Sequence, residues 1–199
     1  MRATLRYLQG DEAGAVAAVR QIVDESPAFE EGLMVASELA FLTEAPDAEV
    51  QVERRFRRAP GLLSGPMLKQ ESNRTSYAWL LLQRSERPRA ATLLSEALEV
   101  AHAELAGGNE NRRVPFEIAA IHIARGEHDA AFDWLDKAVA AGYCDYSTLA
   151  RHPMFERVRR APRFQAALAT MEKNVKAMRD RSAVLAELRT MPFPEVPAR

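Results

Sequence analysis

The sequence predicts an all-α protein, and three observations support that prediction. Alanine, leucine, glutamate and arginine, all good helix formers, dominate the composition. Valine, isoleucine and threonine are sparse, and nowhere do apolar and polar residues alternate over the length of a strand. The 9 glycines and 11 prolines fall between segments with helical apolar spacing. Because the connections are short, we expect successive helices to be antiparallel neighbours.

Each segment with helical apolar spacing defines one expected helix. The predicted helices cover residues 2–9, 12–25, 29–43, 47–58, 70–85, 88–106, 112–125, 128–141, 153–158 and 161–187. Pro153 and Pro162 fit the starts of the last two, because the first helical turn has no partner for the N–H that proline lacks. The residues from Met191 to Arg199 are interrupted by prolines, and we expect residues 189–199 to form an extended or mobile tail.

The composition excludes several classes of protein. A length of 199 residues with 47% hydrophobic and 28% charged side chains is typical of a globular domain. A formal net charge of −1 is unlike that of a general nucleic-acid or membrane-surface binder. Cys144 is the single cysteine, which excludes an internal disulfide, and no apolar run approaches the length of a membrane span. We expect a cytoplasmic protein, or a periplasmic one if a membrane anchor precedes this chain.

An internal repeat organises the predicted helices. Around Gly126, small residues at Ala119 and Ala131 fall where two antiparallel helices must cross closely. The same pattern returns around residues 10, 44 and 85, at intervals of 34, 41 and 41 residues. The copy around residue 44 is degenerate, with Glu49 at the small position.

These copies resemble the tetratricopeptide repeat, a helix–turn–helix unit of about 34 residues. The resemblance implies a right-handed superhelix of about four antiparallel hairpins. The chain begins inside the first helix of the first unit, as a fragment or a protein with a truncated first repeat does.

A second, more specific resemblance lies in the carboxyl-terminal third. Pro153, Phe155 and Arg157, followed by Pro162-Arg163-Phe164, are similar to the closing segment of bacterial tetratricopeptide domains. The resemblance implies a cap at about 145–188 that covers the last hairpin and completes a single domain over residues 1–188. It also implies a regulatory domain of a larger signalling or transcription protein, because such domains follow winged-helix, nucleotide-cyclase or serine/threonine-kinase domains.

No catalytic or cofactor motif stands out. The sequence lacks a glycine-rich phosphate loop, a Gly-x-Ser-x-Gly elbow and a His-Glu-x-x-His pair. His122 and His128 fall on different helices, and we expect the first to be packed and the second solvated. Cys144 follows a helix carboxyl end, where the dipole does not activate a thiol. We therefore expect a protein that is not an enzyme and that holds no cofactor or metal; an enzyme of unrecognised type stays as an alternative.

The basic residues are mostly arginine. Lysine occurs only at 69, 137, 173 and 176, which leaves 27 − 4 = 23 arginines. They cluster at Arg54–Arg58, at Arg112-Arg113 and from Arg157 to Arg163. Because acidic residues balance them, we expect solvated helix faces with internal ion pairs and not direct nucleic-acid binding.

The repeat interpretation predicts a partner-binding groove. In this family the first helix of each unit lines the concave face, where aromatic anchors with a charged rim suit a peptide. The predicted groove residues are Tyr7, Glu38, Phe41, Thr75, Trp79, Leu82, Arg113, Phe116 and Ile123. We expect a non-catalytic scaffold that binds a peptide, a partner domain or a second copy of itself. The alternative is a regulatory module that senses a small molecule.

Overall fold

A computed structural model describes residues 2–25, 30–58, 60 and 71–190, without the side chains of residues 2, 22–24, 30–32 and 183–190. The described part of the chain is helical throughout and contains no strand. Its α-helices are α1 (Arg2–Leu8), α2 (Glu12–Glu25), α3 (Glu30–Leu42), α4 (Ala48–Arg58), α5 (Asn73–Gln83), α6 (Arg87–Ala106), α7 (Arg113–Arg125), α8 (His128–Ala140), α9 (Tyr146–Leu149) and α10 (Pro162–Thr190). A 3₁₀ helix, η1, covers Pro153–Val158.

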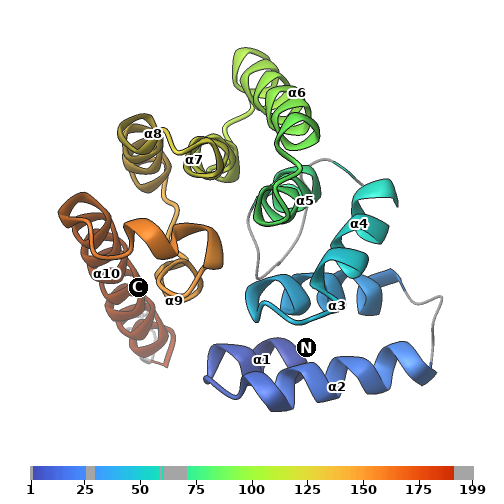
Figure 1. Ribbon diagram of the computed structural model, residues 1–199. Coiled ribbons are helices and arrows are strands. Elements are labelled where there is room, and N and C mark those ends of the chain that lie inside the picture. The colour runs from blue at the N-terminus through green and yellow to red at the C-terminus, as the bar shows by residue number, and fades with distance from the viewer. Residues whose placement is uncertain (1, 26–29, 59, 61–70, 191–199) are drawn as a thin grey trace, which may run out of the picture.

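Four helical hairpins follow one another along the chain: α1 with α2, α3 with α4, α5 with α6 and α7 with α8. Figure 1 shows them as an arc, with α1, α3, α5 and α7 on its inner side. Each hairpin also packs on the next one along the chain. The predicted fold class, an α-helical solenoid of tetratricopeptide-like hairpins with a capping helix, is confirmed.

The four hairpin turns have the same backbone geometry. Gly10, Glu44, Ser85 and Gly126 all have positive φ, at 88°, 49°, 65° and 78°. Around Gly126, for example, the Glu127 N–H donates to the His122 carbonyl and the Gly126 N–H donates to the Ile123 carbonyl. This pair of hydrogen bonds ends a helix through one residue in the left-handed conformation, and glycine adopts that conformation without strain. The sequence repeat recurs around these same four turn residues.

The hairpins pack closely where the sequence supplies small residues. Ala15, Ala90 and Ala131 are each at most 1% exposed. The second hairpin has Glu49 at this position, and its carboxylate instead forms an ion pair with Arg84 at the end of α5. The degenerate second repeat therefore still forms the α3–α4 hairpin, but an ion pair to Arg84 stands where the other repeats have a buried alanine.

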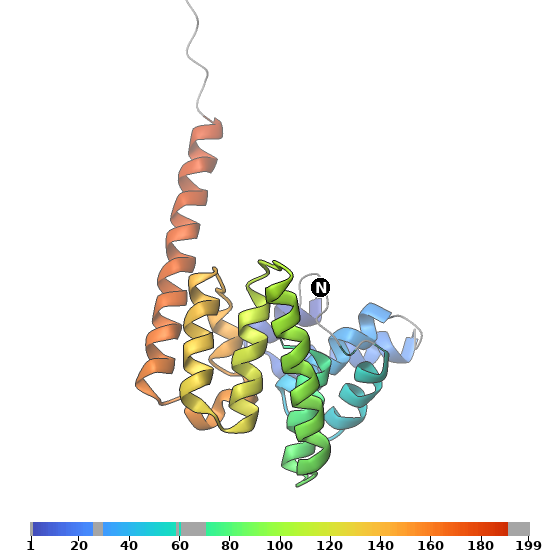
Figure 2. The same cartoon turned by 90° about the horizontal axis from the view of Figure 1, so that it is seen from above.

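The segment after α8 caps the last hairpin. Arg163, at the start of α10, donates to Asp133 and Asp136 in the middle of α8, at 2.8 and 2.7 Å. The next residue, Phe164, is fully buried against Phe155. From there α10 runs beside α8 and extends beyond the ends of the other helices (Figure 2).

The observed helices differ from the predicted ones at a few positions. Helix α9 was not predicted. Asp145 caps its start, since the Asp145 carboxylate accepts a hydrogen bond from the Thr148 N–H at 3.3 Å. The helix expected at 70–85 begins at Asn73, because Ser72 caps it, and residue 70 lies outside the described residues. Arg189 and Thr190, expected in the tail, are helical; residues 191–199 lie outside the described residues.

Candidate functional site

The predicted groove residues lie on the inner helices, and most of them are buried. Tyr7 is on α1, Glu38 and Phe41 on α3, Thr75, Trp79 and Leu82 on α5, and Arg113, Phe116 and Ile123 on α7. Only Trp79 and Leu82 are half-buried; the other seven are between 0% and 8% exposed. Their role in binding a partner stays a prediction, but in this conformation a partner reaches few of them.

The chain's own capping segment covers the concave centre. His152 lies between the rings of Phe41 on α3 and Phe116 on α7, with centroid distances of 5.7 and 6.4 Å. Phe155 of η1 stacks on Phe116 at 5.9 Å and meets His152 edge-on. Residues 146–158 thus fill the space that the repeat pattern predicted to be a partner's.

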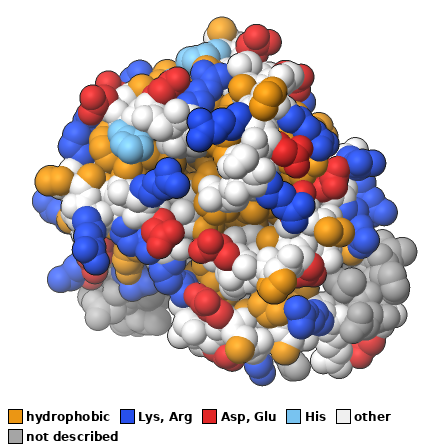
Figure 3. Space-filling view, viewed as in Figure 1, with side chains coloured by type: hydrophobic (Ala, Val, Ile, Leu, Met, Phe, Trp, Pro, Cys, Tyr) orange, Lys and Arg blue, Asp and Glu red, His pale blue; other side chains and the backbone are white. Residues whose placement is uncertain are grey.

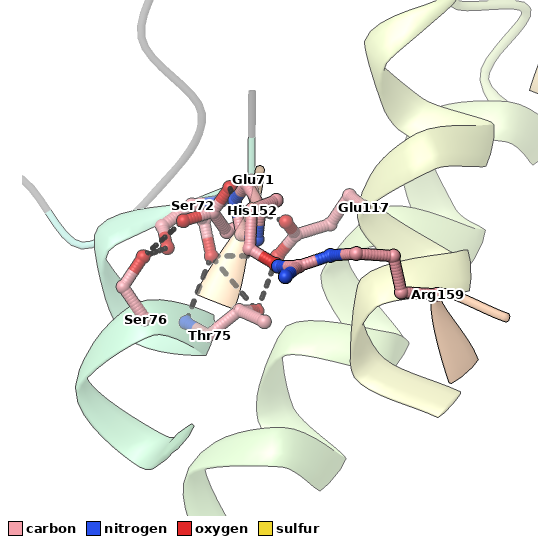
Figure 4. Close-up of polar contacts among 7 residues, drawn as sticks. All are labelled: Glu71, Ser72, Thr75, Ser76, Glu117, His152 and Arg159. Atoms are coloured by element: carbon pink, nitrogen blue, oxygen red, sulfur yellow. Dashed lines mark hydrogen bonds and ion pairs between the residues drawn. The ribbon is translucent and has the colours of Figure 1, made fainter. Parts of the chain in front are cut away.

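A buried polar cluster joins the cap to the start of α5 (Figure 4). The Glu71 carboxylate accepts a hydrogen bond from the Ser76 hydroxyl at 2.6 Å, and its other oxygen lies 3.0 Å from Nε2 of His152. Both Glu71 and His152 are 1% exposed. The Arg159 guanidinium donates to the His152 carbonyl at 3.4 Å. These contacts fix the imidazole in the centre of the arc.

Glu117 of α7 forms the second half of this cluster. Its carboxylate accepts from the Ser72 N–H at 2.7 Å, and from the hydroxyls of Ser72 and Thr75 at 2.6 Å each. Burial raises the pKa of Glu117, and these three donors oppose that shift. Burial also lowers the pKa of Arg113, against the nearby carboxylates of Glu38, Glu71 and Glu117. The carboxylates of Glu71 and Glu117 therefore find hydrogen-bond partners inside the fold, whereas Nδ1 of His152 is buried without one.

Sequence reasoning missed Glu71, Ser72, Ser76, Glu117 and His152 as members of one cluster. A signal for them was present. Polar residues Glu71, Ser72 and Asn73 lie at the start of α5, and Glu117 is the single acidic residue of the largely apolar α7. A carboxylate on an apolar helix face needs buried donors, and hydroxyls at the start of a neighbouring helix supply them.

One arginine joins the cap to the first hairpin. The Arg151 guanidinium donates to the Tyr7 carbonyl at 3.2 Å and lies over the Tyr7 ring, 4.5 Å from its centroid. It also lies 3.7 Å from the Glu12 carboxylate. The cap therefore contacts both ends of the arc.

An open hollow lies beside η1, at the hairpin turns after α5 and α7. Its volume is about 760 Å³. Trp79, Leu82 and Ile123 line it, together with Met154 and Val158 of η1. Phe41 supports Trp79 from behind, with ring centroids 5.4 Å apart. Three of the nine predicted groove residues therefore line this hollow, with Trp79 and Leu82 accessible and Ile123 largely buried.

Charges of both signs surround this turn-end hollow. Arg87, Arg157, Glu44 and Glu156 line it, and their side chains make no hydrogen bond or ion pair with another described residue. By contrast, Glu127 lies 2.5 Å from His122, and Arg125 donates to Ser95 at 3.0 Å. Figure 3 likewise shows basic and acidic side chains interspersed over the face seen in Figure 1. The hollow combines an apolar floor with four charges open to a ligand.

The other singled-out residues lie outside this site. His122 is half-buried against Glu127, and His128 is exposed at the edge of the hollow. Cys144 is a half-buried free thiol. Arg57 and Arg163 form the expected surface ion pairs, whereas Arg55 and Arg113 are buried, contrary to the solvated faces that their clusters predicted.

The fold and site together define a tetratricopeptide-like helical-hairpin protein. The sequence matches no family model and no curated protein. Among solved structures it is similar to MamA, with 17% identity and a TM-score of 0.39 over 87% of this chain and 96% of that chain. The fold class follows from the four helical hairpins and their shared turn geometry. None of the helices in the described residues has the length and apolar composition that crossing a bilayer requires.

Proposed function

We propose that this chain is a non-catalytic protein-interaction domain that binds a peptide segment of its partner in the turn-end hollow. The supporting observation is that Trp79, Leu82 and Ile123 leave an apolar surface beside four charges that have no described partner. A half-buried tryptophan with a charged rim is typical of interface hot spots. The polar cluster at the centre is closed, so it offers no comparable site.

An extended segment suits this hollow better than a compact small molecule. The lining comes from α5, α6, α7, α8 and η1, with Glu44 added by the turn after α3. Charged side chains spread over so many elements match charges spaced along a peptide. On this proposal the domain is the regulatory part of a larger protein, and its partner controls or localises that protein.

Screening a displayed peptide library for binding to the full chain tests this function. Peptides selected by the wild type should bind Trp79→Ala roughly tenfold more weakly or worse, because the anchor of the hollow is lost. Trp134→Ala is the matched control, since Trp134 is also half-buried but packs on Lys137 and His102 at the outer helix α8.

Isothermal titration measures the affinities, and circular dichroism checks that each variant is folded. Selected peptides that bind Trp79→Ala and wild type equally would overturn the proposal. A library that yields no binder to the folded wild type would count against it as well.

A further inference from the structure

The residues after α10 have the composition of a ligand for a groove of this kind. The sequence Met191-Pro192-Phe193-Pro194-Glu195-Val196-Pro197-Ala198-Arg199 contains a Pro-x-x-P spacing between Pro194 and Pro197. Segments of this type favour the polyproline II conformation and dock in grooves lined by aromatic side chains. Trp79 supplies such a side chain in the turn-end hollow.

The segment 191–199 and the turn-end hollow also carry complementary charges. The segment carries one acidic and one basic residue, Glu195 and Arg199, separated by four positions. The hollow offers Arg87 and Arg157 for the first and Glu44 and Glu156 for the second. Phe193 and Val196 are three positions apart, the repeat of polyproline II, so both side chains can reach one apolar floor.

The segment cannot reach the hollow of its own chain. Val158 lines the hollow, and α10 begins four residues later, at Pro162. The contacts of Arg163 with Asp133 and Asp136 place this start beside the middle of α8, and Figure 2 shows α10 running on beyond the ends of the other helices. The 29 residues of α10 span about 43 Å. Residues 191–199, fully extended, span at most about 32 Å.

We propose that residues 191–199 of one copy occupy the turn-end hollow of a second copy. This inference rests on the proposed function, because it names an occupant for the same hollow. Such a contact joins two different surfaces, so two copies can exchange segments in a closed dimer or continue head to tail.

Two substitutions in the full chain test the contact from its two sides. Trp79→Ala removes the hollow's anchor and keeps the segment, whereas Phe193→Asp alters the segment and keeps the hollow. Wild type should associate increasingly as its concentration rises in light scattering coupled to size exclusion. Each variant alone should stay monomeric, and an equal mixture should form a 1:1 dimer and stop there.

The mixture separates this inference from other kinds of association. A wild type that stays monomeric at every concentration, a Phe193→Asp chain that associates like wild type, or a mixture that stays monomeric would each overturn it. Glu156→Arg is a second hollow variant that cannot disturb the core, because Glu156 is exposed. It should weaken association several-fold.

The outcome is distinguishable from failure of the proposed function. A synthetic peptide of residues 188–199 should bind Phe193→Asp chains and quench or shift the fluorescence of Trp79. If library peptides bind the hollow and this peptide does not, the proposed function stands and the second copy is excluded as its occupant.

Discussion

Helices α5 and α7 each have one end in the closed centre of the molecule and the other at its edge. At their amino ends, Ser72 and Thr75 meet Glu117 in a polar cluster with at most 5% exposure. At their carboxyl ends, Trp79, Leu82 and Ile123 line an open hollow. The difference comes from the cap, because His152 and Phe155 cover the first region while η1 forms only a wall of the second. A polar cluster is therefore buried at one end of these two helices, and part of the apolar surface at the other end is left accessible.

The largest expected effect is on the covered end. Phe155→Ala should lower the free energy of unfolding by about 3–5 kcal/mol, because a fully buried ring contacting Phe116 and Phe164 leaves a cavity. Denaturant unfolding measures the change. A loss below about 1 kcal/mol would show that the cap does not fill the centre.

The inner face of the repeat could be predicted from the sequence, but its cover could not. Helical spacing and the turns at Gly10, Glu44, Ser85 and Gly126 placed the nine groove residues on the inner helices. Which of them a partner can reach depends on residues 146–158, whose path is set by long-range contacts such as His152 with Glu71. A local pattern carries no information on a contact 81 positions away.

The second expected effect concerns the carboxylate in the closed cluster. Glu117→Gln should cost about 1–3 kcal/mol, because the amide keeps only one acceptor oxygen and the three donors of Ser72 and Thr75 can no longer all be accepted. The folded-state pKa of Glu117 lies above its ordinary value of 4.5, so folding favours the protonated form. Its contribution is fully present in acid and is lost as the pH rises through the folded-state pKa. Unfolding curves at several pH values should therefore show the gap between wild type and Glu117→Gln widening as the pH falls, and a gap that is constant with pH would contradict this account.

A smaller effect is expected at the turns that border the hollow. Ser85 has φ at 65°, a conformation that costs a non-glycine residue free energy. Ser85→Gly should stabilise the fold by up to about 1 kcal/mol, whereas Gly126→Ala should destabilise it by about 1 kcal/mol. Thermal unfolding of the two variants should move in opposite directions, and shifts of the same sign would show that these turns are not equivalent.

The smallest effect on stability is expected at the hollow's rim. Arg87→Ala and Arg157→Ala should change the unfolding free energy by less than about 0.5 kcal/mol, because neither side chain has a described partner. Both should weaken the binding of library-selected peptides. Rim variants that destabilise the fold as much as Glu117→Gln would remove the distinction between the two ends of α5 and α7.

Hydrogen exchange of the full chain, read by mass spectrometry with and without a selected peptide, tests the central claim most directly. We predict that amides in residues 146–158 of the free protein are protected like those of α7, and that the peptide adds protection around Trp79 and Leu82 while the start of α5 is unchanged. Exchange of residues 146–158 at the rate of an unfolded segment would contradict the account, because the concave centre would then be open to a partner.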